Sequence, residues 1–191
     1  MATQILANFV GYQGVIYYCL SYNHKTVVYR DKLHKNLVVI NSTDIGVSFP
    51  EYSMEKKVLG NKLRVHGEAS RLDQLSGMPW LTGLQDYIFC GEISQIPEKT
   101  TPAHVQRVQV KSNVERVRRR HMKRHNLNEG EVKIKIPLAV EKRLNLPYLI
   151  VNSESTQQKF RLFVRQEKVA EHYSGQFNTY GLSKGATVHL F

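Results

Sequence analysis

Residues 63–79 read LRVHGEASRLDQLSGMP and carry the clearest fold signal in the chain. The first four residues, Leu63–His66, are strand-like. Ser70–Leu75 is predicted to be a short helix, with its serine as the N-cap and its two leucines as the apolar stripe. The glycine and the proline that follow end this helix. The stretch therefore predicts a strand followed closely by a helix.

The segments on either side complete a small α+β domain. Asp44–Pro50 (DIGVSFP) predicts a short strand followed by a turn, and Tyr87–Ile96 predicts another strand. A helix is expected near Lys32–Val39. Together these elements predict an N-terminal domain of ferredoxin-like type over residues 1–97.

The first 30 residues are atypical for such a domain. Val15–Tyr22 and Thr26–Tyr29 are β-branched and aromatic, which favours strands. The first Lys or Arg is Lys25, so no basic segment opens a secretory signal, and the apolar stretch Val15–Leu20 is too short to span a membrane. We expect a soluble, cytoplasmic protein with no membrane partner.

A linker is predicted at Pro97–Pro102 (PEKTTP), which is polar and has a proline at each end. Residues 98–191 are then expected to form a C-terminal arm that carries a basic helix. The other elements expected in this arm are a strand at Val105–Val110, a helix around Leu138–Leu144, a hairpin of Tyr148–Val151 and Phe160–Val164, and a terminal hairpin of Phe177–Thr179 and Thr187–Leu190 closed over the turn Gly181–Gly185.

The basic helix predicts a polyanionic partner. Residues 104–125 contain eight Lys or Arg and a single acid, so this segment carries +7 of the chain's net charge of +11. Val114, Val117 and His121 share one face, on which the helix can dock. A cationic stripe favours nucleic acid because neutralising phosphates releases condensed counterions, although a solvated basic surface is the alternative. The stripe lies at positions i, i+3, i+4, i+7 and i+8: Arg116, Arg119, Arg120, Lys123 and Arg124.

No metal and no cofactor are predicted. The acidic residues are scattered, and Glu129 and Glu131 flank a turn-like glycine; Cys19 and Cys90 lack a CxxC spacing or a histidine partner. RNA can nevertheless be cleaved without metal, because its own 2′-hydroxyl can attack the adjacent phosphorus when a general base is present. Histidine suits that role, but composition does not choose among the eight in this chain.

The joint order of several motifs resembles the repeat-processing endoribonuclease of type I-F CRISPR systems, over roughly residues 31–191. The resemblance implies a ferredoxin-like domain and an arm whose arginine-rich helix enters the groove of a repeat RNA hairpin. It further implies metal-independent cleavage at the 3′ base of the stem by the 2′-hydroxyl, which leaves a 2′,3′-cyclic or 3′ phosphate, and retention of the product in a larger surveillance complex. The motifs are DIGVSFP at residues 44–50, PWL with GL at 79–84, RVQVKSN at 107–113, ER followed by the arginine run from 115, SEST at 153–156, FRLF at 160–163 and YGLSKG at 180–185.

The resemblance also implies roles for single residues. His34 matches the general base, Ser153 the serine that holds the attacking ribose, and Tyr180 the tyrosine that orients the histidine. Lys123 stands where the family has arginine, so a point charge replaces a planar fork. The residues implied in RNA binding are Arg107 and Gln109 as base readers, Phe160 as the aromatic that stacks on the closing base pair, Ser155 and Thr156 beside the scissile phosphate, and the groove-facing Arg119, Arg120, Lys123 and Arg124.

Two other functions stay open on the sequence. The atypical N-terminus is compatible with a catalytically inactive relative that only binds the hairpin RNA. A basic-helix regulator that binds DNA or RNA is the alternative from another class. Taken without the resemblance, His34 would be a histidine on a helix surface, and Ser153 and Ser155 would be hairpin-turn residues.

Overall fold

The computed structural model describes residues 14–20, 26–83, 86, 88–109, 114–136, 144–152 and 158–191. Its first sheet is built around β3 (Lys62–Gly67). This strand pairs antiparallel with β2 (Gly46–Ser48) on one side and β1 (Gly14–Leu20) on the other. β1 in turn pairs with β4 (Ile88–Cys90) and with β5 (Ser94–Gln95), which gives the order β2-β3-β1-β4. The strands predicted around residues 44–50 and 63–66 are confirmed.

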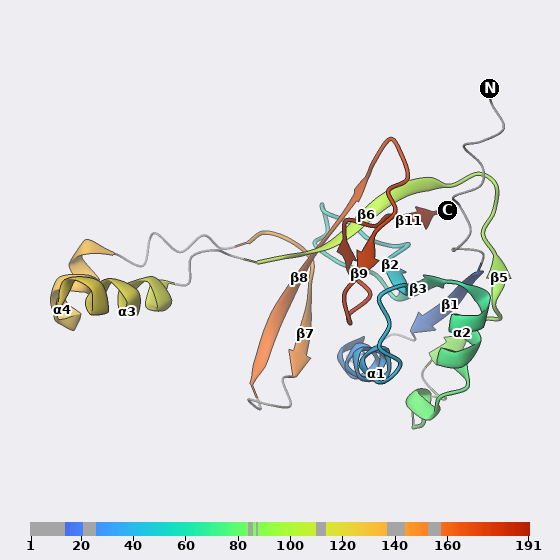
Figure 1. Cartoon of the computed structure of the whole chain (residues 1–191), viewed down its shortest axis with the longest axis horizontal. Helices are drawn as coiled ribbons and strands as arrows, with labels where there is room; N and C mark the ends of the chain where they lie inside the picture. Colours follow the sequence, from blue (N-terminus) through green and yellow to red (C-terminus); the bar gives the residue numbers. More distant parts are fainter. Residues whose placement is uncertain are drawn as a thin grey trace. The chain divides into compact units, whose positions relative to one another are not determined.

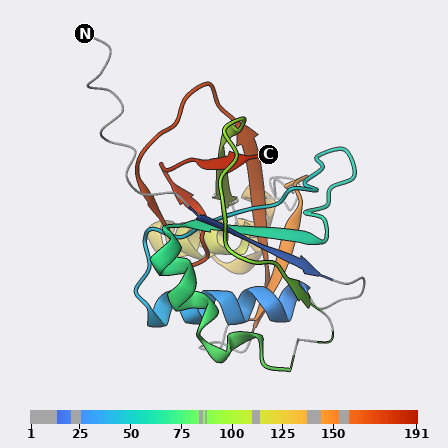
Figure 2. The same ribbon diagram turned by 90° about the vertical axis from the view of Figure 1, so that its right-hand side faces the viewer.

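Two helices lie on the same side of β1 and β3, α1 (Thr26–Val39) and α2 (Ala69–Ser76) (Figures 1 and 2). Leu33 and Leu37, one helical turn apart in α1, are buried, and so are the two leucines of α2. The helical spacing of these leucines therefore buries both helices against the sheet. A short 3-10 helix, η2 (Pro79–Leu81), follows α2 and begins with the proline predicted to end α2.

One prediction at the start of each of these two helices is wrong. Thr26–Tyr29 is the first turn of α1 instead of a strand, because the buried stripe of α1 outweighs the strand propensity of its first residues. Ser70 is the second residue of α2 instead of its N-cap. The N-cap is Glu68, which makes no side-chain capping hydrogen bond.

The second sheet has the order β11-β6-β8-β7. β7 (Tyr148–Asn152) and β8 (Lys159–Lys168) form the predicted antiparallel hairpin, and β6 (Thr101–Val108) lies between β8 and β11 (Val188–Leu190). The amide side chain of Gln166 in β8 also exchanges two hydrogen bonds with the backbone of Phe49, at 2.9 and 3.0 Å. This contact fastens the second sheet to the residue after β2.

The predicted terminal hairpin is wrong in its pairing. β9 (Gln176–Phe177) pairs with β10 (Ser183–Lys184), which lies within the segment predicted to be the turn. β11 instead pairs with β6, in the register Val188 opposite Ala103. Sequence patterns alone favour the nearest partner in the chain, whereas here burial of Val188 selects a strand whose paired residue, Ala103, lies 85 positions earlier.

The chain divides into two compact units, residues 1–107 with 146–191 and residues 108–145. This division differs from the predicted boundary at 97/98, because the hydrophobic core of the first unit includes residues from both sheets, such as Val65 of β3 and Val105 and Leu162 of the second sheet. Cys90 is exposed. No helix among the described residues has the length and apolar character needed to cross a membrane.

The second unit contains α3 (Val114–His125) and α4 (Glu129–Lys135). α3 is the predicted basic helix. Residues 129–131, predicted as a turn, form the first turn of α4 instead, because Asn128 and Glu131 build a reciprocal capping box that starts the helix. The predicted helix around Leu138–Leu144 lies almost entirely outside the described residues.

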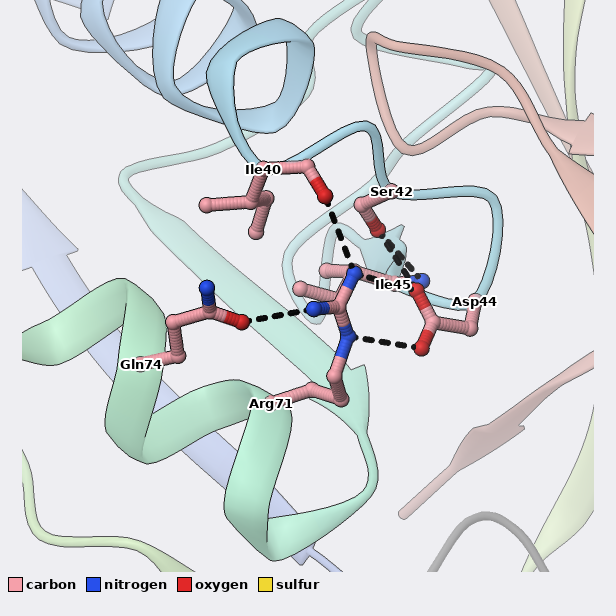
Figure 3. Close-up of polar contacts among 6 residues, drawn as sticks. All are labelled: Ile40, Ser42, Asp44, Ile45, Arg71 and Gln74. Atoms are coloured by element: carbon pink, nitrogen blue, oxygen red, sulfur yellow. Dashed lines mark hydrogen bonds and ion pairs between the residues drawn. The ribbon is translucent and has the colours of Figure 1, made fainter.

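A polar network secures the end of α1 (Figure 3). The Nε and Nη2 atoms of Arg71 donate to the carboxylate of Asp44, at 2.9 and 3.4 Å, and Nη2 also donates to the carbonyl of Ile40 at 3.2 Å. The hydroxyl of Ser42 donates to the same carboxylate at 2.8 Å. Partial burial raises the pKa of Asp44, but the hydrogen bonds from Arg71 and Ser42 outweigh it and leave the pKa below its ordinary value.

This network makes one contribution to stability depend on pH. The lowered pKa means that the ionised carboxylate of Asp44 is favoured in the folded state, which stabilises the fold at neutral pH. This stabilisation is lost as the pH falls through the folded-state pKa of Asp44 and the carboxylate is protonated. We expect Asp44→Asn to lower the free energy of unfolding by about 1 kcal/mol at pH 7, since both partners are partly exposed. The difference from the wild type should shrink in acid, and urea unfolding at pH 7 and pH 3 measures it.

A matched control is Glu167→Gln, which removes a carboxylate from the more exposed pair with Arg165. It should change the free energy of unfolding by less than about 0.5 kcal/mol. Equal effects of the two substitutions at pH 7 would contradict a special role for the Asp44 network.

Candidate active site

His34 is held in one orientation by a backbone carbonyl. It follows buried Leu33 on α1 and is itself half-buried. Its Nδ1 lies 2.8 Å from the carbonyl oxygen of Thr179, 145 residues further along the chain. A carbonyl only accepts, so we assign the proton of the neutral ring to Nδ1 on the basis of this partner. The lone pair of the neutral ring then resides on Nε2, the nitrogen that can accept a proton.

Tyr180 fixes the plane of the same ring. The Tyr180 and His34 rings are stacked, with centroids 3.9 Å apart and an angle of 10° between their planes. The structure thus brings together two of the three residues predicted for catalysis. Thr179 completes the arrangement through its backbone oxygen. Its role could not be predicted from the sequence, because every residue has a backbone carbonyl.

The loop that carries Thr179 and Tyr180 is seated on the first sheet. The backbone N–H of Phe177 donates to the carbonyl of Thr43, and that of Val47 donates to the carbonyl of Gly181, both at 2.9 Å. Gly181 has a φ of +70°, and a Cβ there would lie 2.6 Å from a methyl group of Val47. The glycine is therefore required for this close approach of the loop to β2.

Three other histidines are poorly suited to be the base. Burial lowers the pKa of His66 well below its ordinary value, and the charges of Arg64 and His189 lower it further. Burial also lowers the pKa of His189 to about 4, with a further contribution from His172. The pKa of His172 itself is lowered by burial. Such depressed pKa values make these three imidazoles weak bases at neutral pH.

The third predicted catalytic residue, Ser153, lies outside the described residues, as do Ser155 and Thr156. The segment that contains them joins β7 to β8, whose last described pair is Asn152 opposite Lys159. β7 packs against α1, the helix that carries His34. The ends of the serine-containing segment are therefore anchored in the same compact unit as His34.

Arg107 and Phe160 are also brought together. The guanidinium carbon of Arg107, near the end of β6, lies 5.8 Å from the ring centroid of Phe160 on β8, which is within the range of a cation–π contact. Phe160 is half-buried and packs against the core of the first unit. Gln109 follows β6 and is exposed.

In the second unit, the basic residues of α3 divide into two kinds. Arg118 donates two hydrogen bonds to the carbonyl of Ile136, at 2.9 and 2.7 Å, and is a structural residue that ties α3 to the end of α4. Val114 is buried, which agrees with its predicted docking face. Arg116 lies in α3, but its side chain is outside the described set. The side chains that are exposed are those of Arg119, Arg120, Lys123 and Arg124, four of the five predicted for the cationic stripe.

Comparisons with known proteins show which family the chain is similar to. Residues 25–191 match the family described as CRISPR-associated protein (Cas_Csy4). The chain is 45% identical to the CRISPR-associated endonuclease Cas6/Csy4 of Pseudomonas aeruginosa (strain UCBPP-PA14) over 163 residues, which cover 84% of this chain and 86% of the relative. It is 40% identical to the endonuclease of the same name from Escherichia coli (strain UTI89 / UPEC) over 161 residues, with the same coverage.

Proposed function

Because the chain belongs to the Csy4 family of CRISPR-associated proteins, we propose that it is the repeat-processing endoribonuclease of a type I-F CRISPR system. It cuts precursor RNA at the 3′ base of the repeat hairpin and retains the mature guide RNA. The observation that carries this proposal is the arrangement of His34 between the Thr179 carbonyl and the Tyr180 ring. This arrangement leaves a fixed nitrogen lone pair of the kind that a general base needs.

In the proposed reaction the Nε2 atom of His34 removes the proton from the 2′-hydroxyl upstream of the cut. The 2′ oxygen forms a bond to phosphorus while the bond from phosphorus to the 5′ oxygen breaks. The proton is returned to the leaving 5′ oxygen, so the products are a 2′,3′-cyclic phosphate and a 5′-hydroxyl. No step requires a metal ion or a cofactor.

The other residues of the proposed site position the substrate or the base. Ser153 holds the attacking ribose through its hydroxyl and does not act as a nucleophile. Ser155 and Thr156 lie beside the scissile phosphate, where hydroxyl and backbone donors would stabilise the charge that develops on phosphorus. Tyr180 keeps the His34 ring in the plane that the attack needs. The anchoring of β7 against α1 supports the assignment of the 153–157 segment to this site.

Two regions recognise the hairpin. Arg107 and Gln109 read bases at the foot of the stem, since arginine pairs with guanine and glutamine with adenine, and Phe160 stacks on the closing base pair. The contact of Arg107 with Phe160 supports a shared role for these two. The exposed basic side chains of α3 bind the phosphates of the stem. The major groove of a long A-form duplex is too deep and narrow for side chains, so the substrate is a short stem whose groove opens at its ends.

The architecture proposed for the family is a ferredoxin-like domain followed by an arm with the arginine-rich helix. The element order β1-α1-β2-β3-α2-β4 and the sheet order β2-β3-β1-β4 support the ferredoxin-like assignment. The separate compactness of residues 108–145 supports an arm centred on α3. We further propose that the protein acts in the cytoplasm as a subunit of a type I-F surveillance complex.

One assay separates the proposed enzyme from its alternatives. Repeat hairpin RNA and an unstructured RNA of the same length are incubated with the protein in excess EDTA. Cleavage of the hairpin at a single position supports the enzyme, whereas hairpin binding without cleavage indicates the inactive relative. Equal affinity for both RNAs would contradict hairpin recognition and favour a general nucleic-acid-binding regulator.

A further inference from the structure

Asn178 organises the loop that holds His34. Its side-chain oxygen, Oδ1, accepts hydrogen bonds from the backbone N–H groups of Tyr180 and Leu182, at 2.8 and 3.1 Å. The Asn178 backbone adds two more, since its N–H donates to the carbonyl of Leu182 and its carbonyl accepts from the N–H of Gly181, both at 2.8 Å. Four hydrogen bonds through one residue thus close the segment 178–182.

The segment closed by Asn178 contains both groups that contact His34. Thr179 supplies the carbonyl at 2.8 Å and Tyr180 supplies the stacked ring. Phe177, which precedes the segment, and Leu182, its last residue, are buried and anchor its ends, whereas Thr179 and Tyr180 are only half-buried. Core packing therefore secures the two ends of the segment, and the Asn178 amide oxygen fixes the course of the backbone between them.

An asparagine suits this position for a chemical reason. Its amide oxygen accepts two N–H groups at short range, as asparagine does in tight turns, and it adds no charge. A leucine has nearly the same size but accepts no hydrogen bond. An aspartate keeps the acceptor oxygen. These two residues therefore separate the hydrogen bonds of Asn178 from its volume.

We propose that Asn178 is a positioning residue for the general base His34. By fixing the Thr179 carbonyl and the Tyr180 ring, it holds the imidazole as the tautomer with the proton on Nδ1 and the acceptor on Nε2. The catalytic part of this inference rests on the proposed function. The structural part, that Asn178 controls the tautomer of His34, is independent of the proposed function.

Three measurements test the proposal. Single-turnover cleavage of the hairpin RNA should be about 10- to 100-fold slower for Asn178→Leu, because small misplacements of reacting groups cost about that much. Hairpin affinity should stay within about twofold, because the α3 stripe dominates it. In the free protein, long-range ¹H–¹⁵N NMR spectra of the imidazoles should show the His34 proton on Nδ1 in the wild type and divided between both nitrogens in Asn178→Leu.

Asn178→Asp is the rescue variant and should keep the wild-type tautomer and a rate within about threefold of the wild type, since it retains the acceptor. Ser53→Ala is the control, because it also removes a side-chain oxygen that accepts a backbone N–H, from Lys56 in another turn; its rate should not change. If Asn178→Leu fails to fold, Asn178→Ala replaces it.

Three outcomes would overturn the proposal: a folded Asn178→Leu or Asn178→Ala protein with the wild-type rate and tautomer, a folded Asn178→Asp protein as slow as Asn178→Leu, or a rate loss with an unchanged tautomer. Failure of the proposed function looks different. In that case the wild type would not cut the hairpin at all, while the NMR comparison of the variants would still report whether Asn178 controls His34.

Discussion

His34→Ala should abolish cleavage of the repeat hairpin while leaving its affinity for that RNA within about twofold of the wild type. Removal of a general base costs about 10²- to 10⁴-fold in rate, and the fixed Nε2 lone pair of His34 has no substitute among the contacts described around it. Single-turnover cleavage with protein in excess measures the rate, and filter binding to the uncut RNA measures the affinity.

His104→Ala is the matched control for this experiment. His104 is also half-buried, and its Nδ1 also lies near a backbone carbonyl, that of Ala186 at 3.0 Å. Its ring is stacked on Tyr173 in a looser arrangement, with centroids 5.6 Å apart. The control should cut within about threefold of the wild-type rate. If His34→Ala cuts as fast as His104→Ala, the assignment of the base is wrong.

The second large effect is expected from α3. The double substitution Arg119→Ala with Arg120→Ala should weaken hairpin binding about 100- to 1,000-fold at 0.15 M salt, because two exposed charges that release counterions are lost. The slope of log affinity against log salt should become shallower by about one for each arginine. Cleavage at saturating protein should stay near the wild-type rate, because neither residue contacts His34 in the proposed mechanism.

Lys133→Ala is the control that removes a cation of the same unit from outside the α3 stripe. Lys133 is an exposed cation of the same compact unit, but it lies on α4 and pairs with Glu129 at 3.3 Å. It should change the affinity less than about threefold. Arg118→Ala should act differently again, by lowering the stability of the second unit through the loss of its bonds to Ile136. An unchanged affinity and salt slope in the double variant would contradict hairpin recognition by the α3 stripe.

Much of the fold could be predicted from local patterns. The strand and helix at residues 62–76, the hairpin of β7 and β8, and the basic helix α3 each carry their own periodicity or turn signals. Long-range pairings carry no such signal. The pairing of β11 with β6 depends on which strand buries Val188 in three dimensions, and that cannot be read from the neighbouring residues.

The N-terminus shows the same limit. The first turn of α1 contains residues that favour strands. The segment is nevertheless helical, because the helix buries Leu33 and Leu37, which lie one turn apart further along α1. The helix predicted near Lys32–Val39, which contains His34, is confirmed, so the error concerned only the first turn of α1. The missed helix α4 has a physical cause as well: Asn128 and Glu131 form a capping box, whereas the glycine between them suggests a turn.

Only some residues of the candidate site could be predicted from the sequence. His34 and Tyr180 could be predicted from the family resemblance, and the structure brings their rings to 3.9 Å. Thr179 and Asn178 could not be, because one acts through a backbone oxygen and the other through hydrogen bonds to backbone N–H groups. The roles of Ser153, Ser155 and Thr156 stay predictions, since these residues lie outside the described part of the chain.

The most direct test of the central claim, metal-independent attack by the 2′-hydroxyl under His34 base catalysis, uses one modified RNA. A repeat hairpin with a single 2′-deoxy residue just upstream of the cut is incubated with the protein in EDTA, next to the unmodified hairpin. The deoxy RNA should bind with an affinity within about threefold of the unmodified RNA, because a single hydroxyl contributes little to a phosphate-dominated complex. It should remain uncut, while the unmodified RNA yields a 2′,3′-cyclic phosphate end. Cleavage of the deoxy RNA at the normal rate would contradict the account.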